Sequence, residues 1–263
     1  PFKTRGRLCT RMQPRDLSAH EAYVPGRGAE EVARDLGVDP EDLIKLSSNE
    51  NPHGPSPAAV EAIEATAPTV NVYPKASHTD LTARIADKWG LEPEQIWVSP
   101  GADGAIDYVS RAFLEPGDAA LLPDPGFSYY PMSTRYHHGE VTTYPVRKAD
   151  DFRQAAADVL EAYDGERIVH VTTPHNPTGS TFPPDELRAL ADGVDDHTLV
   201  AVDAPYGAHG TDPSAIVLLD HYDDIALLGT FSESYGLARL RVGYAALPRA
   251  WADAYANVNT PFA

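Results

Sequence analysis

The sequence predicts an α/β fold in which helices flank a mostly parallel β-sheet. Short runs of apolar and β-branched residues alternate along the chain with amphipathic stretches of helical periodicity. Clusters of Pro, Gly and Asp separate these segments, as expected of connecting turns. With 263 residues, the chain is long enough for one large domain of this kind, alone or with a fragment of a second.

Six apolar runs have the length of buried strands. They are residues 96–98, 119–122, 141–144, 168–172, 199–202 and 225–228. Amphipathic stretches predict helices at residues 57–65, 79–89, 104–113, 152–163, 184–192 and 248–257. We therefore expect a large domain at 51–263, preceded by an arm at 12–50 with one helix around 29–36. Residues 1–11 are basic but have no apolar core, so we interpret them as a leader upstream of a natural start at Met12 and not as a secretory signal.

The chain is strongly acidic, with a net charge of -18 and 39 acidic residues against 21 basic ones. The acidic residues are spread along the whole chain, which is typical of a solvated surface and not of an acidic tail. Such a surface repels nucleic acid and anionic membranes. Because concentrated salt screens this self-repulsion, the composition predicts a halophilic, cytoplasmic protein. No apolar run of about eighteen residues is present to span a membrane.

Cysteine and histidine usage indicates no disulfide and no metal site. Cys9 is the single cysteine and has no partner in the chain. The histidines at 137–138 and at 170 and 175 lack ligand-like spacing with carboxylates, so we expect no bound metal.

Polar residues follow several of the predicted strands, where open parallel sheets gather their functional groups. Asp203 ends the run at 199–202, Asn176 follows the run at 168–172, and Ser232 follows the run at 225–228. The segment 101–104 (GADG) joins a strand to a helix, and its small residues let backbone N–H groups face an anion. Each feature alone also occurs as a plain connection or a helix cap.

Taken in order, these segments resemble the histidinol-phosphate aminotransferases. The resemblance rests on YVPGR at 23–27, LSSNENP at 46–52, YPK at 73–75, GADG at 101–104, PGF at 125–127, PHNPTG at 174–179, VDAPY at 202–206 and TFSESYGLARLRVGY at 230–244. It implies the large domain of the fold type I pyridoxal 5'-phosphate (PLP) enzymes, with an N-terminal arm. It also implies that the C-terminal small domain is missing.

The resemblance also implies roles for individual residues. Asp203 would hold the pyridine nitrogen of the cofactor protonated, so that the ring withdraws electrons from the substrate. Asn176 and Tyr206 would hydrogen-bond the phenolate oxygen, and Phe127 would stack on the ring. The residues expected at the cofactor phosphate are Ala102, Asp103, Gly104, Thr230, Ser232 and Arg241. Tyr73 would reach the phosphate of a neighbouring subunit in a homodimer, and Tyr23 and Asn51 would line the substrate entrance.

Glu233 departs from the family, because it stands where the resemblance implies the lysine that binds the cofactor covalently. No lysine follows Lys148. Glutamate cannot form that bond, so we expect PLP or pyridoxamine 5'-phosphate to be held non-covalently and activity to be impaired. Two further departures are Arg239 in place of glycine, which we expect to crowd the phosphate site, and Ala204-Pro205. Together they suggest a truncated, decayed or deliberately altered copy.

Three functions remain open at this point. The first is amino transfer between histidinol phosphate and 2-oxoglutarate in histidine biosynthesis, slowed by the loss of the lysine. The second is a non-catalytic PLP-fold protein that pairs with a complete paralogue. The third is an enzyme for another substrate, such as a threonine-phosphate decarboxylase or another amino-acid aminotransferase. In each enzyme reading the partners are small molecules: a phosphorylated amino alcohol or amino acid, and a 2-oxo acid.

Overall fold

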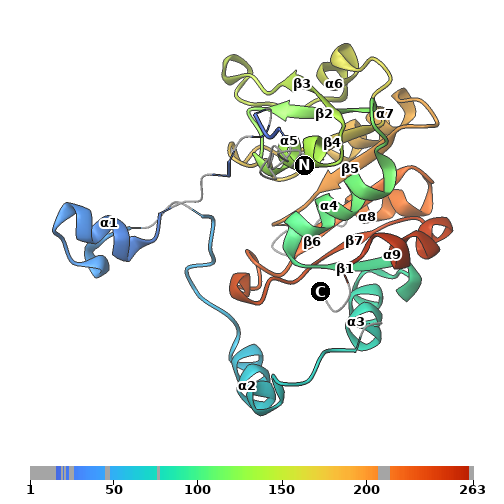
Figure 1. The fold of residues 1–263 in the computed structure, drawn as a ribbon. Helices are drawn as coiled ribbons and strands as arrows, with labels where there is room; N and C mark the ends of the chain where they lie inside the picture. Colours follow the sequence, from blue (N-terminus) through green and yellow to red (C-terminus); the bar gives the residue numbers. More distant parts are fainter. Residues whose placement is uncertain are drawn as a thin grey trace, which may run out of the picture.

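A computed structural model describes residues 16–18, 20, 22–23, 27–44, 48–75, 78–206 and 214–260. The expected leader at 1–11 lies outside these ranges. Within them, seven strands form one sheet with helices on both faces, and two N-terminal helices lie outside this body (Figure 1). No helix of the described residues combines the length and the apolar character needed to cross a bilayer.

The sheet is mostly parallel, as the sequence predicts. Its strands are β1 (Ile96–Ser99), β2 (Ala119–Asp124), β3 (Glu140–Pro145), β4 (Ile168–Thr172), β5 (Leu199–Asp203), β6 (Ile225–Thr230) and β7 (Gly243–Ala246). Their order is β1-β7-β6-β5-β4-β2-β3. β2 to β6 pair in parallel, whereas β7 pairs antiparallel with both β1 and β6. The carboxyl ends of β4, β5 and β6 therefore lie side by side at one edge of the sheet.

The helices alternate with the strands, as βαβ crossovers require. They are α1 (Ala29–Leu36), α2 (Pro57–Thr66), α3 (Thr79–Trp89), α4 (Gly101–Phe113), α5 (Tyr129–Tyr136), α6 (Ala156–Ala162), α7 (Pro184–Gly193), α8 (Ser214–Val217) and α9 (Ala252–Val258). Short 3₁₀-helices are η1 (Pro40–Asp42), η2 (Ala67–Thr69), η3 (Pro93–Gln95), η4 (Lys148–Asp150), η5 (Leu218–Asp220), η6 (Ala238–Leu240) and η7 (Arg249–Trp251).

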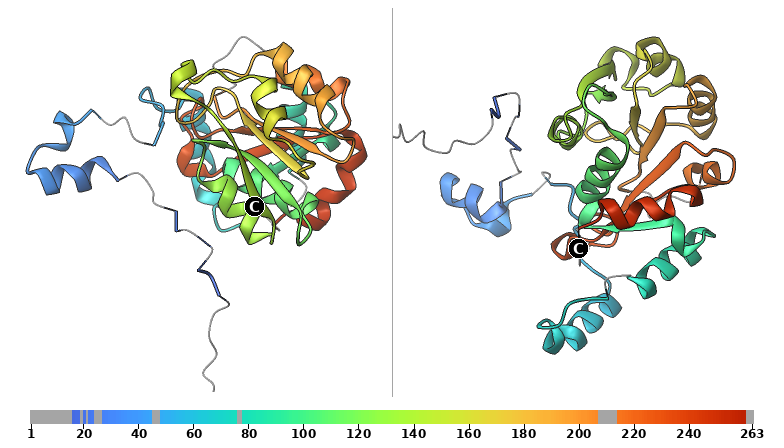
Figure 2. Two further views of the ribbon diagram at one scale, coloured as in Figure 1. Left: turned by 90° about the horizontal axis from the view of Figure 1, so that it is seen from above. Right: turned by 45° about the vertical axis from the view of Figure 1, so that its right-hand side comes forward.

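Two apolar cores lie on opposite faces of the sheet. Successive side chains of a strand point to opposite faces of the sheet, so that Leu121 packs in one core and Leu122 in the other. Helices α3, α6, α7 and α8 contribute to the first core, and α4, α5 and α9 contribute to the second. The turned views show this helix–sheet–helix layering (Figure 2). Because both faces are covered, β4, β5 and β6 are buried along their whole length.

Several elements differ from the sequence-based expectation. The short helix α8 was not predicted, α4 begins at Gly101 and not at residue 104, and α9 begins at Ala252 and not at residue 248. The strand β7 was not predicted, because four residues of Gly, Tyr and Ala carry no β-branched pattern. Helix α5 was not predicted either, since its sequence, YYPMSTRY, shows no clear apolar period. Helix α6 begins at Ala156 and not at Phe152, because Asp151 and Phe152 both have φ near +54°, outside the right-handed helical region.

Close backbone contact joins β7 to the start of α4. A Cβ on Gly243 would lie 2.4 Å from the carbonyl carbon of Gly101, so that only glycine fits there. This contact places the segment before β7, including Arg241, against the first turn of α4. The two segments are far apart in sequence and together form one wall of the site described below.

Helices α1 and α2 lie apart from the sheet and its covering helices (Figures 1 and 2). Helix α2 begins at a Ser56 cap and Pro57, a favourable N-terminal pair, but buries none of its residues. Apolar side chains of this region are exposed, namely Leu36, Val38, Ile44, Val60, Ile63, Val70, Val72 and Tyr73. Exposed apolar side chains on segments that lie apart from the main body are typical of surfaces that another chain covers.

We expect a second copy of the chain to cover this region. Val70 and Val72 are 84% and 67% exposed in the single chain. Burying a valine contributes about 1.5–3 kcal/mol, so Val70→Asp with Val72→Asp should raise the dimer dissociation constant roughly a hundredfold or more. Light scattering over a concentration series at constant salt measures this change. Val217→Asp, at a 39% exposed valine on α8, is the matched control. A monomer at every concentration of the unaltered chain would contradict the expectation.

Candidate functional site

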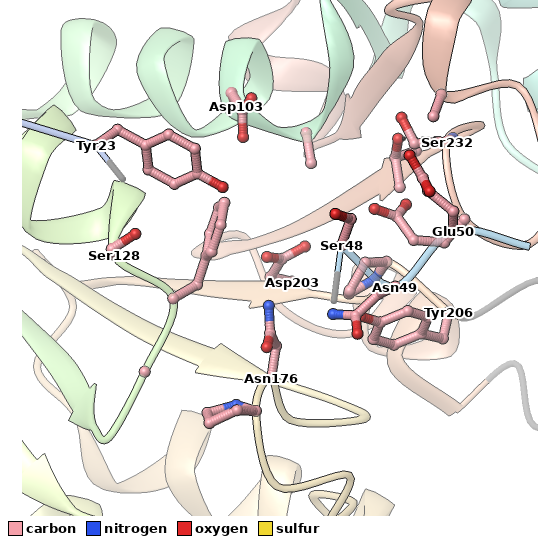
Figure 3. A pocket seen from close by; sticks show the side chains of 18 of the residues that line it. Tyr23, Ser48, Asn49, Glu50, Asp103, Ser128, Asn176, Asp203, Tyr206 and Ser232 are labelled. Carbon is pink, nitrogen blue, oxygen red and sulfur yellow. Dashed lines mark hydrogen bonds between the residues drawn. The ribbon is translucent and has the colours of Figure 1, made fainter. Parts of the chain in front are cut away.

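A cavity of about 530 Å³ lies at the carboxyl ends of β4, β5 and β6. Its position follows from the topology, because the connections after these strands all leave from the same edge of the sheet. Side chains from the arm, the first turn of α4 and the loops after β2, β4, β5 and β6 line it. Figure 3 shows Asp103, Asp203 and Asn176 directed toward this space from three different elements.

Asp203, the last residue of β5, is the most deeply buried acid of the cavity, with 3% of its surface exposed. Its Oδ2 accepts a 2.6 Å hydrogen bond from the Tyr130 hydroxyl, whereas its Oδ1 is buried without a partner. Burial raises the pKa of Asp203 to about 7; the Tyr130 hydrogen bond lowers it, and the charges of Glu233 and Asp103 raise it. The cavity therefore presents a carboxylate oxygen that lacks a donor.

Tyr130 supports Asp203 from behind the cavity, a role that the sequence did not reveal. Its hydroxyl also lies 2.8 Å from Thr172 Oγ1, at the end of β4. Its ring stacks on His170, with centroids 4.7 Å apart. Burial lowers the pKa of His170 to about 3, so this imidazole is a neutral packing group. The sequence feature that could have indicated this support is the presence of His170 and Thr172 in an otherwise apolar strand.

Asn176, Tyr206 and Phe127, the residues expected at the cofactor ring, line the cavity. Asn176 lies in the loop after β4, and Tyr206 follows β5 by three residues. Burial, together with the charge of Glu233, raises the pKa of Tyr206 to about 12, so its hydroxyl keeps a proton to donate. Phe127 packs edge-to-face on Tyr130, with centroids 5.6 Å apart. This contact fixes the orientation of the Phe127 ring.

The opposite end of the cavity contains donors suited to an anion. Ala102 and Asp103 lie in the first turn of α4, where backbone N–H groups have no partner within the helix. Thr230, at the end of β6, and Ser232 line the same end. Arg241 is hydrogen-bonded through Nη2 to Asp103 Oδ2 at 3.2 Å and through Nη1 to Ser232 Oγ at 3.4 Å.

Glu233 lines the cavity immediately after Ser232, in the turn that follows β6. The turn is closed by a 3.1 Å hydrogen bond from the Gly236 N–H to the Glu233 carbonyl. The Oε2 of Glu233 is buried and has no hydrogen-bond partner. Burial raises the pKa of Glu233, and the charge of Asp103 adds to this, whereas a hydrogen bond from its own backbone N–H and the charge of Arg241 lower it. The position expected to carry a lysine therefore holds a carboxylate with one oxygen that is buried without a partner.

Residues 41–263 match the family model for class I and II aminotransferases. The chain belongs to this family. It is 71% identical over 252 residues to the histidinol-phosphate aminotransferase of Haloquadratum walsbyi, covering 96% of this chain and 67% of that protein. It is 69% identical over 252 residues to the protein of the same name from Haloferax volcanii, covering 96% of this chain and 70% of that protein.

Solved aminotransferase structures show the same fold. The histidinol-phosphate aminotransferase of Sinorhizobium meliloti, in complex with pyridoxal-5'-phosphate, has 26% identity and a TM-score of 0.80, covering 91% of this chain and 65% of that chain. The Thermus thermophilus aspartate aminotransferase with maleate has 22% identity and a TM-score of 0.73, covering 89% and 65%. This aminotransferase chain thus spans about two thirds of the length of the proteins it matches.

The three remaining predicted residues do not line the cavity. Gly104 lies one residue beyond Asp103 in α4, where a Cβ would lie 2.4 Å from Cδ of Pro100. Asn51 donates through Nδ2 to the Ser234 carbonyl at 3.1 Å and so connects the arm to the turn that contains Glu233. Tyr73 is 78% exposed and lies outside the cavity, and a single chain does not test its role toward a partner subunit.

Two further departures from the family are at Arg239 and at Ala204-Pro205. Arg239 is exposed and does not line the cavity, so the expectation that it crowds the site is wrong. Pro205 does line the cavity, between Asp203 and Tyr206.

Several lining residues of the aminotransferase site were not singled out in the sequence. They are Ser48, Asn49, Glu50, Gly126, Ser128 and Pro177. Each of them lies within or beside a motif on which the resemblance rests, and Tyr23 of the arm also lines the cavity. In the described ranges, no three His, Cys, Asp or Glu side chains group as metal ligands would.

The raised pKa of Asp203 predicts a pH-dependent stability of the cofactor-free protein. Below about pH 4 the carboxyl is protonated in both the folded and the unfolded state. Between pH 4 and 7 the unfolded chain releases this proton while the folded chain retains it, so Asp203 lowers the free energy of unfolding as the pH rises. A shift from 3.8 to about 7 corresponds to ~4 kcal/mol.

Asp203→Asn should therefore gain stability relative to the unaltered chain by up to ~4 kcal/mol between pH 4 and pH 7. Urea unfolding at constant salt over this range measures the difference. Asp87→Asn, at an exposed position on α3, is the matched control. A difference between the two chains that stays constant with pH would show that Asp203 titrates normally.

Proposed function

We propose that this chain is the cofactor-binding part of a histidinol-phosphate aminotransferase. The reaction is amino transfer between histidinol phosphate and 2-oxoglutarate, in histidine biosynthesis, and Glu233 slows it. The family membership and the names of the haloarchaeal relatives support this proposal. The observation that carries it is the buried, unpartnered Oδ1 of Asp203 in a cavity whose other end contains anion-binding groups.

The cavity fits the ring and the phosphate of pyridoxal 5'-phosphate. Asp203 Oδ1 would accept a hydrogen bond from the pyridine nitrogen, which supplies the donor that this oxygen lacks. Asn176 and Tyr206 would donate to the phenolate oxygen, since the raised pKa of Tyr206 keeps its hydroxyl protonated. Phe127 would cover one face of the ring.

The phosphate would be bound at the first turn of α4. The amides of Ala102, Asp103 and Gly104 face an anion there, and Thr230 and Ser232 add hydroxyl donors. Arg241 supplies the positive charge, and a bound phosphate would compete with Asp103 for it. Tyr73 of a second subunit would complete this end in a homodimer, and Tyr23 and Asn51 would border the entrance for the substrate.

When bound, the cofactor supplies an electron-withdrawing ring that stabilises negative charge at the substrate α-carbon. The residues of the chain prepare this chemistry. Ionised Asp203 keeps the pyridine nitrogen protonated, and Tyr206 balances the charge on the phenolate oxygen. The loops after β4, β5 and β6 hold these groups at fixed spacing because the strands beneath them are fully buried.

Glu233 does not fit the covalent attachment of the cofactor. A carboxylate forms no bond with an aldehyde, so the cofactor would be held by non-covalent contacts alone. Glu233 can still carry a proton, and its raised pKa favours this use. The same observation supports a second candidate, a non-catalytic partner of a complete paralogue. We propose a cytoplasmic location in either case.

Asp203 should contribute more to cofactor affinity than any other acid. Removing one partner of a buried ion pair costs about 3–5 kcal/mol, so Asp203→Ala should weaken cofactor binding roughly a hundred- to a thousandfold. Asp195→Ala, at an exposed position, should change it little. Fluorescence titration with pyridoxal 5'-phosphate measures both variants. Equal losses in the two would remove Asp203 from the site.

Glu233→Lys tests the function itself. This variant should form a covalent bond with pyridoxal 5'-phosphate, seen as an absorbance band that borohydride reduces, and Glu233→Gln should not. Proton transfer by a positioned side chain contributes about 10²- to 10⁴-fold, so amino transfer from histidinol phosphate should be faster by that order in Glu233→Lys. If the band appears and another amino donor is converted while histidinol phosphate is not, the substrate is wrong but the cofactor site is right.

A further inference from the structure

The cavity carries an excess of negative charge. Four acids line it, namely Glu50, Asp103, Asp203 and Glu233, and among its described lining residues Arg241 is the one cation. Arg241 is already hydrogen-bonded to Asp103. Neither Asp203 nor Glu233 is paired with a cation in the described part of the chain, and each has one carboxylate oxygen that is buried without a partner. A ligand that fits here should bring hydrogen-bond donors and positive charge.

The order of residues around the cavity shows which part of a bound cofactor would lie beside Glu233 and would carry the positive charge that this carboxylate lacks. Asp203 is the candidate partner of the pyridine nitrogen, Tyr206 of the phenolate oxygen, and Ser232 of the phosphate. On the pyridine ring, the carbon that carries the aldehyde or the amine lies between the carbon with the phenolate oxygen and the carbon with the phosphate arm. Glu233 follows Ser232 directly, and its charge acts on both Tyr206 and Asp203. It therefore borders the position of the variable substituent.

The forms of the cofactor differ only at this substituent. Pyridoxal 5'-phosphate has an aldehyde there, which accepts hydrogen bonds but donates none. Pyridoxamine 5'-phosphate has an aminomethyl group, which is protonated in water and offers three donors. Pyridoxine 5'-phosphate has a hydroxymethyl group, a single neutral donor. All three present the same nitrogen, phenolate oxygen and phosphate, so the contacts to Asp203, Tyr206 and Ser232 do not distinguish them.

We propose that this chain binds pyridoxamine 5'-phosphate in preference to pyridoxal 5'-phosphate, with the Glu233 carboxylate paired to the ammonium group of the amine. This inference rests on the proposed cofactor site and adds the form of the cofactor that the site selects. The aldehyde would leave Glu233 Oε2 desolvated and without a donor, whereas the ammonium group supplies both a donor and a compensating charge. The pairing also offsets the repulsion between Glu233 and Asp203.

The size of the preference follows from the type of contact. A hydrogen bond between charged groups changes affinity roughly ten- to a hundredfold relative to the unmade contact. Pyridoxine 5'-phosphate, which can donate one neutral hydrogen bond to Glu233, should bind with an affinity between those of the other two forms.

Calorimetric titration of the cofactor-free chain with each of the three compounds is the test. The unaltered chain should bind pyridoxamine 5'-phosphate roughly ten- to a hundredfold more tightly than pyridoxal 5'-phosphate. Glu233→Gln retains the shape of the side chain but loses its charge, so it should reduce this ratio to within about threefold. Glu161→Gln, at an exposed position on α6, should leave the ratio unchanged and is the matched control.

The outcomes separate the inference from the function on which it rests. Equal binding of all three forms by the unaltered chain overturns the role of Glu233 but leaves the cofactor site in place. A preference for pyridoxamine 5'-phosphate that persists in Glu233→Gln assigns the selectivity to another residue and also overturns the inference. Binding of none of the three overturns the cofactor site and the inference together. A circular dichroism spectrum of each variant confirms that it is folded.

Discussion

Four carboxylates line one cavity, and two of them, Asp203 and Glu233, each have a buried oxygen without a partner; this is the constraint on which the site depends. Burying a charge without a partner is unfavourable by several kcal/mol, so Asp103, Asp203 and Glu233 each need compensation. Arg241 is hydrogen-bonded to Asp103, and its charge also lowers the pKa of Glu233. Tyr130 donates a hydrogen bond to Asp203, but neither Asp203 nor Glu233 forms an ion pair with a cation in the described part of the chain. The parallel topology makes this convergence unavoidable, because β5 and β6 are neighbours whose carboxyl ends share an edge.

Much of the fold could be predicted from the sequence, because the buried strands are continuous apolar runs. Every strand expected from such a run is present, and helix α3 has the predicted bounds. The sequence-based prediction was wrong where contacts between distant parts of the chain determine the local structure. The strand β7 forms because Gly243 lets the backbone approach Gly101, and the late start of α6 follows from positive φ angles at Asp151 and Phe152. Neither feature leaves a periodic signal.

The candidate site was predictable to the extent that its residues follow strands or belong to recognisable motifs. Asp203, Asn176 and Ser232 were expected from their position alone, and the family motifs added most of the others. Tyr130 was missed because it comes from a helix on the far side of Asp203 and acts through a single hydrogen bond. Periodicity and motif spacing do not reveal a contact between residues 73 positions apart, although this hydrogen bond lowers the pKa of Asp203 against the effect of burial.

The surface and the cavity are both acidic, but salt screens the exposed carboxylates and not the buried ones. A net charge of -18 fits the halophilic relatives, since at about 1 M salt the Debye length is only ~3 Å and exposed charges scarcely repel one another. Salt does not reach Asp203 Oδ1 or Glu233 Oε2, because both atoms are shielded from solvent. Their charge must be relieved by a proton or by a ligand. Adaptation to salt therefore accounts for the surface acids but not for Glu233, whose carboxylate is better understood through the charge of the molecule that fills the cavity.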